Sequence, residues 1–123
     1  MTKIDFRAAA STPSTTILDT GKLHVTASCD AMGNLSVIAT TTVDNATLSS
    51  YGNSLDFSSD GFDAATPIDI TPGGHDPNNL PREERTFVYS EPGGQIVVIV
   101  YQASLDTLGG TVACLVSGVA FVQ

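Results

Sequence analysis

The sequence predicts an all-β domain, an antiparallel β-sandwich of the jelly-roll type with about eight to ten strands. Apolar and polar residues alternate in several short segments, and turn-forming residues separate these segments at intervals of roughly eight to twelve residues. Thr, Ser, Val, Ala and Gly dominate the composition, while Lys and Arg together number only 5. Since β-branched side chains fit a pleated surface, this composition favours strands. A length of 123 residues suits a single domain spanning residues 1–123.

The N-terminal third contains the clearest alternation. Residues 3–9 predict a first strand, and residues 11–14, "STPS", predict a turn before a short strand that ends near Gly21. Residues 23–29 alternate without interruption, which places Cys29 on the apolar face together with the core residues. A turn at "DAMGN" and a second alternating run at residues 35–43 complete a predicted hairpin.

The remainder of the chain combines turn-rich segments with strongly apolar strands. Residues 44–63 are polar, with one short strand expected around residues 55–57 and a tight turn at Asp60-Gly61. A short strand at residues 66–71 precedes a long loop at residues 72–85, which is either functional or mobile. The strongest hairpin signal lies at residues 86–105 around a turn at residues 91–94, and residues 112–122 form the predicted final strand.

The two cysteines, Cys29 and Cys114, lie in strand-like segments near opposite ends of the chain. Their spacing does not resemble a zinc site, so a disulfide is expected. In the chain-entropy model, closing a loop of this length stabilises the fold by about 4 to 5 kcal/mol. The alternative is a pair of buried free thiols. A disulfide would favour an oxidising compartment, which indicates a secreted or cell-surface protein.

Two strands are apolar on both faces, at residues 96–100 and 112–122. A sandwich strand usually keeps one face in water, so these strands are expected to be covered on their outer side. The cover is either a long loop of the same chain or a second subunit. The second alternative predicts a homo-oligomer whose interface contains Ile96, Val98, Val100, Val112, Val116 and Phe121.

The formal net charge of −8 narrows the range of partners. A strongly acidic chain repels phosphate, so nucleic acid is not an expected partner, and anionic membrane surfaces are disfavoured. The longest apolar run, residues 96–100, is far too short for membrane insertion. The sequence contains no export signal, so either the protein is not exported or the signal has been removed.

Signatures of catalysis are missing from the sequence, so we predict neither an enzyme nor a cofactor. No Gly-x-Ser-x-Gly motif, phosphate-binding loop or dinucleotide fingerprint occurs. His24 is expected to face solvent from a strand, and His75 lies beside Asp76 in the long loop. Two segments, beginning at Asn34 and Asn45, fit the N-glycosylation acceptor pattern.

Several aspartates between residues 56 and 69 are weak candidates for calcium ligands, because calcium is bound by several oxygen atoms. The candidates are Asp56, Asp60 and Asp63, with Asp69 nearby. Their spacing does not match the D-x-[DN]-x-[DN]-G loop, and the alternative is that they are exposed acids in turns.

Residues 15–50, "TTILDTGKLHVTASCDAMGNLSVIATTTVDNATLSS", together with "GGTVACLVSGVAF" near the C-terminus, resemble an uncharacterised group of secreted actinobacterial proteins. In that group a similar cysteine-containing β-domain follows an export signal, sometimes with collagen-like or low-complexity repeats between them. The resemblance implies a secreted head domain without a catalytic motif. The segments "IDFRAAAS" and "LVSGVAFV" also look like the first and last strands of tumour-necrosis-factor and complement-type jelly rolls, which implies a trimer by analogy.

Three functions remain open at this point. The favoured one is a non-enzymatic structural or recognition head domain on a secreted or surface-attached protein, which associates with itself and binds a surface ligand that the sequence does not identify. The second is a structural subunit of a phage or a surface appendage, such as a capsid decoration or tail protein. The third is a calcium-dependent carbohydrate-binding module.

Overall fold

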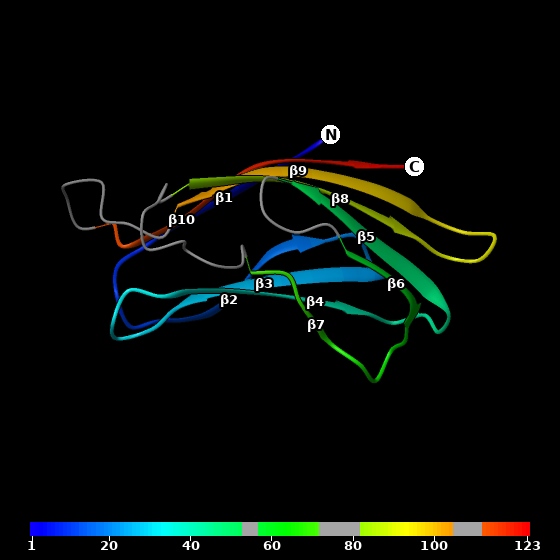
Figure 1. Cartoon of the computed structure of the whole chain (residues 1–123), viewed down its shortest axis with the longest axis horizontal. Coiled ribbons are helices and arrows are strands. Elements are labelled where there is room, and N and C mark those ends of the chain that lie inside the picture. Colours follow the sequence, from blue (N-terminus) through cyan, green and yellow to red (C-terminus); the bar gives the residue numbers. More distant parts are fainter. Residues whose placement is uncertain (53–56, 72–81, 105–111) are drawn as a thin grey trace.

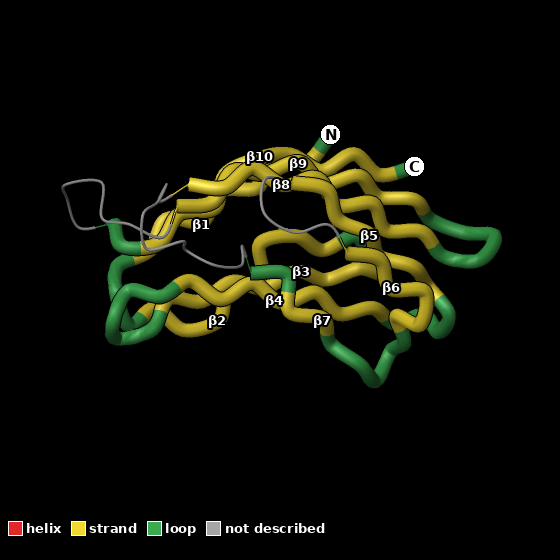
Figure 2. The backbone as a smooth tube through the Cα atoms, in the orientation of Figure 1, coloured by secondary structure: helices red, strands yellow, loops and turns green. Residues whose placement is uncertain are grey.

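The chain folds into two antiparallel β-sheets that pack face to face (Figures 1 and 2). The computed structural model describes residues 1–52, 57–71, 82–104 and 112–123. These residues form ten strands and no helix. The strands are β1 (Thr2–Ala8), β2 (Thr12–Asp19), β3 (Leu23–Cys29), β4 (Leu35–Thr41), β5 (Ala46–Gly52), β6 (Phe57–Phe62), β7 (Ile68–Asp69), β8 (Arg82–Ser90), β9 (Ile96–Ser104) and β10 (Cys114–Val122).

The strand order confirms the predicted all-β sandwich and refines its topology. One sheet has six strands in the order β1-β10-β9-β8-β5-β6, and the other has four in the order β2-β3-β4-β7. The consecutive strands β8, β9 and β10 are neighbours in one sheet, as are β2, β3 and β4 in the other. Each sheet therefore contains a three-stranded meander, whereas a jelly roll is built from two Greek keys. The strand order differs in this respect from the predicted jelly-roll type.

Strict alternation defines the hairpin of β3 and β4, which the sequence predicted. Every second residue is buried in both strands, and the register runs from Leu23 opposite Thr41 to Cys29 opposite Leu35. The buried side chains point toward the six-stranded sheet, because successive residues of a strand face opposite sides. The second strand of this hairpin ends at Thr41, two residues before the predicted end.

Aromatic side chains of the six-stranded sheet fill much of the space between the layers. The rings of Phe62 and Tyr89 meet edge to face with their centroids 6.0 Å apart, and those of Phe87 and Tyr101 stack at 5.5 Å. All four rings are buried. Pairs of this kind stabilise a core by about 0.5 to 1.5 kcal/mol beyond the burial of their area.

The predicted turn at residues 11–14 is wrong for most of its length. The chain reverses at Ser11, whose φ is 66°, and β2 begins at Thr12, so Pro13 lies inside a strand. Proline is tolerated there because β2 is the edge strand of its sheet, where a missing N–H removes no hydrogen bond to a second neighbour.

Two strands occupy the region that was predicted to be polar and turn-rich. In β5 the alternate residues Ala46, Leu48 and Ser50 are buried, so the segment has the strand periodicity but small and polar side chains on its buried face. Asp60 and Gly61 belong to β6 rather than to a tight turn. Leu55 and Asp56, on which part of the predicted strand fell, lie outside the described residues.

The C-terminal half largely follows the prediction. The hairpin of β8 and β9 forms around a turn in which Gly93 has a φ of 64°. Strand β8 already begins at Arg82, so residues 82–85 of the predicted loop are strand, and residues 72–81, including His75, lie outside the described residues. Strand β10 begins at Cys114, two residues later than predicted.

Candidate functional site

The outer face of the six-stranded sheet carries a cluster of apolar side chains across three neighbouring strands. Antiparallel register places Val119 of β10 opposite Val100 of β9, and Phe121 opposite Val98. Val98 in turn lies opposite Val88 of β8. These residues alternate with the buried positions of the same strands, so they point away from the core. We call this set the apolar patch, and it consists of Val88, Ile96, Val98, Val100, Val119 and Phe121.

The apolar patch is accessible to solvent. Phe121 is 47% exposed, Ile96 42% and Val100 41%, whereas Val88, Val98 and Val119 between them are half-buried by their neighbours. No described segment of the chain covers this face in Figures 1 and 2, where the four-stranded sheet lies on the opposite side. The described part of the chain does not provide the cover that is expected on the outer side of these strands, and it leaves this apolar side open.

Two of the predicted interface residues lie elsewhere. Val116 is 0% exposed and points into the core between the sheets, because it has the same strand parity as the disulfide residue Cys114. It is not accessible to a second subunit. Val112 is half-buried and precedes β10, away from the apolar patch. Ile96, Val98, Val100 and Phe121 remain as the accessible members of the predicted set.

Polar residues lie beside the apolar patch on the same outer face, toward the start of β10. On the edge strand β1, Asp5 Oδ1 accepts a hydrogen bond from Arg7 Nε at 3.0 Å. The other carboxylate oxygen of Asp5, Oδ2, lies 3.7 Å from Lys3 Nζ. Ser117 of β10 lies opposite Asp5, and Gln102 of β9 lies between Ser117 and Glu84 of β8. The ionised side chains described on this face, Lys3, Asp5, Arg7 and Glu84, sum to zero, although the whole chain has a net charge of −8.

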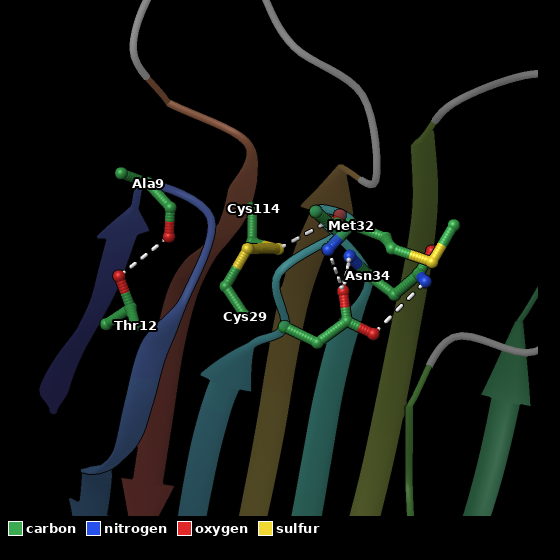
Figure 3. Close-up of a disulfide and its surroundings, with 8 residues drawn as sticks. Ala9, Thr12, Cys29, Met32, Asn34 and Cys114 are labelled. Atoms are coloured by element: carbon green, nitrogen blue, oxygen red, sulfur yellow. Dashed lines mark hydrogen bonds between the residues drawn. A yellow bond between two sulfur atoms is a disulfide. The ribbon is translucent and has the colours of Figure 1, made fainter.

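A disulfide joins the two sheets at one end of the sandwich, as predicted. Cys29 ends β3 and Cys114 begins β10, and their Cα atoms are 6.0 Å apart (Figure 3). The bond spans 85 residues of sequence and links the four-stranded sheet to the six-stranded sheet. Both residues are almost fully buried, so the disulfide is part of the core.

An open, shallow pocket of about 380 Å³ lies beside this disulfide. It lies where β2 bulges from β3, because Thr12 pairs with Cys29 and Thr15 with Ala27, so that two residues of β2 oppose Ser28 alone. The pocket lining combines hydroxyl, carboxylate and amide groups with apolar surface, and the apolar surface is the larger part. The lining consists of Ser11, Thr12, Pro13, Ser28, Cys29, Asp30, Asn34, Leu35 and Ser36.

Asp30 organises the turn at the rim of this pocket. Its Oδ1 accepts hydrogen bonds from the main-chain N–H groups of Asn34 at 2.8 Å and Met32 at 2.9 Å, and its Oδ2 accepts one from Asn34 Nδ2 at 3.2 Å (Figure 3). These bonds, above all the main-chain bond from Asn34, lower the pKa of Asp30 below its ordinary value. The carboxylate is therefore ionised at neutral pH. The sequence indicated the turn but not this role of Asp30.

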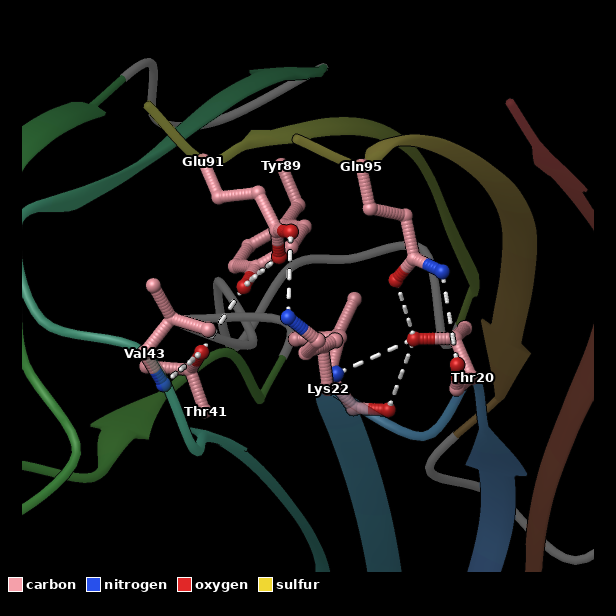
Figure 4. Close-up of polar contacts among 8 residues, drawn as sticks. Thr20, Lys22, Thr41, Val43, Tyr89, Glu91 and Gln95 are labelled. Carbon is pink, nitrogen blue, oxygen red and sulfur yellow. Dashed lines mark hydrogen bonds and ion pairs between the residues drawn. The ribbon is translucent and has the colours of Figure 1, made fainter. Parts of the chain in front are cut away.

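The opposite end of the sandwich is joined by a hydrogen-bonded network instead of a covalent bond (Figure 4). Tyr89 donates to Glu91 Oε2 at 3.0 Å, and its hydroxyl oxygen lies 2.8 Å from Thr41 Oγ1 on the other sheet. Since the tyrosine proton goes to the carboxylate, Thr41 is the donor to Tyr89. Lys22 Nζ lies 3.6 Å from Glu91 Oε1. Lys22 lies in the turn between β2 and β3, so it also connects Glu91 to the four-stranded sheet.

Titration of this network follows from its burial and its hydrogen bonds. A main-chain hydrogen bond from Gln95 is the largest cause that lowers the pKa of Glu91, with Tyr89 and Lys22 acting in the same direction. Burial raises the pKa of Tyr89. Tyr89 therefore stays protonated and Glu91 ionised at neutral pH. The sequence held no signal for this site, because Thr41 and Tyr89 are separated by 48 residues.

The predicted calcium ligands do not assemble into a site in the described part of the chain. Asp63 Oδ1 accepts a hydrogen bond from the main-chain N–H of Asn45 at 2.8 Å, and Asp44 Oδ1 accepts one from Ala64 at 3.1 Å, so these carboxylates connect two turns. Asp56 lies outside the described residues. Among the residues that are described, no group of three or more His, Cys, Asp or Glu is placed to hold a metal ion.

The two histidines and the two possible glycosylation sites are the last residues that the sequence singled out. His24 lies on the outer side of β3 as expected, with its Nδ1 3.2 Å from Asp19 Oδ1. Asn34 and Asn45 are both exposed, and Asn34 Nδ2 donates to Asp30. His75 and Asp76 lie outside the described residues.

No protein-family model, no curated protein and no solved structure matches the chain. Within the described segments, no helix has the length and apolar character needed to cross a membrane.

Proposed function

We propose that this protein is a non-enzymatic structural or recognition head domain of a secreted or cell-surface protein, and that it associates with itself through the outer face of its six-stranded sheet. The apolar patch is the observation on which this proposal depends. Soluble monomers rarely expose a contiguous apolar cluster of this kind, and such clusters are typical of protein contacts. Phe121, Val100 and Ile96 would supply the central contacts, since aromatic and aliphatic anchors contribute most of the energy of an interface.

The size of this face supports a second copy of the chain as its occupant. The strands β1, β10, β9, β8 and β5 lie side by side in the sheet. With neighbouring strands about 4.8 Å apart and a rise of about 3.3 Å per residue, a face of this kind measures roughly 24 Å by 30 Å, or about 700 Å². Stable interfaces of standard size bury about 600 to 1,000 Å² on each partner. A single pair of such faces is therefore large enough.

The charge distribution also supports self-association through this face. Two copies that each have a net charge of −8 repel one another, and the repulsion is smallest where the contact surfaces are themselves neutral. The described ionised groups of this outer face cancel, and Lys3, Asp5 and Arg7 pair within their own strand. The location outside the cell is supported by the disulfide, because such bonds persist in oxidising compartments.

Sedimentation velocity of the intact protein, with the disulfide formed, tests the proposal. We expect the purified chain to sediment as an oligomer of its 12.7 kDa protomer, and the measured mass distinguishes a dimer formed by two facing patches from the trimer that the analogy with complement-type domains implies. The double variant Val100→Thr/Phe121→Ser should sediment as a monomer, because it makes the apolar patch polar while Thr retains a high strand propensity.

The matched control is Ile38→Thr, which makes a similar change on the outer face of the four-stranded sheet, opposite Thr26 and Asp69. This variant should keep the oligomeric state of the wild type. A wild-type protein that stays monomeric at every concentration would contradict the proposal. An equal loss of association in the control would show that the surface of contact is not the apolar patch.

A further inference from the structure

The pocket beside the disulfide has the features of a binding site for a small polar ligand. It exists because β2 bulges away from β3 at Pro13, whose ring nitrogen cannot donate a hydrogen bond to the neighbouring strand. The resulting depression is shallow and open to solvent, and its volume of about 380 Å³ is large enough for one sugar ring but not for a deeply buried ligand. The disulfide at Cys29 holds the base of the pocket to the other sheet, so the pocket is largely formed before any ligand binds.

The pocket contains hydroxyl groups that the described part of the chain leaves available to a ligand. Ser28 and Ser36 face each other across β3 and β4 on the outer side of the sheet, and neither hydroxyl bonds to another described residue. Thr12 Oγ1 donates to the Ala9 carbonyl at 2.7 Å, which leaves its oxygen able to accept (Figure 3). A hydroxyl both donates and accepts, so this set can bind ligand hydroxyls in either sense.

Asp30 adds a fixed acceptor at the rim. Its Oδ2 accepts one hydrogen bond from Asn34 Nδ2 and has capacity for another, and its ionised state is favoured by the turn around it. The side chains of Pro13 and Leu35 supply apolar surface between these polar groups. An alternation of hydroxyl and C–H surface is the chemistry that a sugar ring presents.

From this arrangement we infer that the pocket binds a neutral polyhydroxylated ligand, namely a single sugar unit of a larger glycan, without a metal ion. The net charge of −8 and the Asp30 carboxylate disfavour an anionic ligand. The Asp30 oxygens already accept three hydrogen bonds from the turn, which disfavours a metal ion. The lining includes no aromatic ring, so we expect binding in the millimolar range, by hydrogen bonds, for one sugar unit.

Backbone amide NMR of the intact oxidised protein, titrated with methyl glycosides of mannose, galactose and N-acetylglucosamine, tests this inference. At least one of these probes should cause saturable shifts confined to the amides of Ser11–Thr12, Ser28–Asp30 and Asn34–Ser36. The double variant Ser28→Ala/Ser36→Ala should weaken binding by about tenfold or more, since it removes two hydroxyls that could bond to the ligand.

The control variant is Thr26→Ala/Thr40→Ala, which removes two hydroxyls from the same outer face but outside the pocket. It should leave the titration unchanged. The inference is overturned if none of the three glycosides gives saturable shifts, or if the control loses binding as strongly as the pocket variant. Because the pocket and the apolar patch lie on opposite sheets, failure here leaves the oligomeric state as a separate result.

Discussion

The two ends of the sandwich join the same two sheets by different chemistry. At one end the Cys29–Cys114 disulfide links β3 to β10, and at the other end side chains of Tyr89, Glu91 and Gln95 reach across to Thr41, Lys22 and Thr20. The first link is a single covalent bond with a pocket beside it, and the second is a set of several hydrogen bonds. Each end closes the core where the paired sheets would otherwise separate.

This difference predicts how each end responds to change. A disulfide stabilises the fold mainly by restricting the unfolded chain, so its contribution depends little on pH and is lost all at once on reduction. A buried polar network contributes through bonds that exist only in the folded state, and it becomes unfavourable when one member loses its partner. The hydrogen-bonded end should therefore be sensitive to single substitutions and to acid.

Loss of the disulfide should produce the largest effect. The variant Cys29→Ala/Cys114→Ala is expected to lower the free energy of unfolding by about 4 to 5 kcal/mol, because the bond closes a loop of 85 residues. Urea unfolding measures this loss. Hydrogen exchange should also increase more at Asn34 and Leu35 than at Thr42 and Val43. Equal acceleration at both ends would show that they do not behave as separate attachments.

Thr41 provides the strongest test at the hydrogen-bonded end. Thr41→Val keeps the shape of the side chain but removes the donor to Tyr89 and the acceptor for the Val43 N–H at 3.2 Å. Tyr89 keeps Glu91 as its acceptor but loses its buried donor, and the half-buried Val43 N–H loses its acceptor, so the fold should be destabilised by about 1 to 3 kcal/mol. Urea unfolding of Thr41→Ser, which keeps the hydroxyl, should show most of the stability restored.

The neighbouring residue supplies a matched control for that prediction. Thr40 has the opposite strand parity and lies on the outer face, where it is only half-buried. Thr40→Val should change the free energy of unfolding by less than about 0.5 kcal/mol, as is usual for surface substitutions. If the two valine variants lose the same stability, the loss at Thr41 does not come from the network.

Glu91 makes the hydrogen-bonded end dependent on pH. Its pKa is below the ordinary value of 4.5, so folding is favoured by its ionised form above that pH. This contribution is lost as the pH falls below 4.5 and through the lower pKa of the folded state. Glu91→Gln should reduce stability at neutral pH, and the difference from the wild type should shrink on acidification.

The groups that face Glu91 determine how this experiment is interpreted. Lys22 and Tyr89 contact the carboxylate, and burial raises the pKa of Tyr89, so the tyrosine keeps its proton throughout the acidic range. Asp30, at the other end, also has a lowered pKa, so the variant should retain part of the acid sensitivity of the wild type. A pH profile of unfolding that is parallel for both proteins would contradict the role given to Glu91.

Much of the disulfide end could be predicted from the sequence because its signals are local. The strict alternation of β3 places Cys29 on the buried face, and the turn at "DAMGN" is expected from its composition. The pocket itself was not predictable, because Pro13 reads as a turn residue until β2 is known to be an edge strand. Only the pairing of β2 with β3 shows that the chain bulges at that point.

The hydrogen-bonded end could not be predicted from the sequence, for a different reason. Glu91 belongs to a predicted turn, where a charged residue is ordinarily exposed, yet its side chain is only 6% exposed. Its burial depends on residues of the other sheet, because Lys22 contacts Glu91 directly and Thr41 bonds to Tyr89 beside it. Strand β5 was missed in a similar way, because its buried residues Ala46 and Ser50 become core residues only when β8 lies beside them.

The contact between Thr20 and Gln95 should have the smallest effect of those tested. Thr20 Oγ1 donates to Gln95 Oε1 at 2.6 Å, and Gln95 Nε2 donates to the Thr20 carbonyl at 3.3 Å. Gln95→Ala removes both bonds, but the site is only partly buried, so water can replace them. We expect a loss of about 0.5 to 1 kcal/mol in the free energy of unfolding. A loss as large as that of Thr41→Val would contradict this comparison. It would mean that the partly buried bonds of Gln95 contribute as much to stability as the buried bonds of Tyr89 and Glu91.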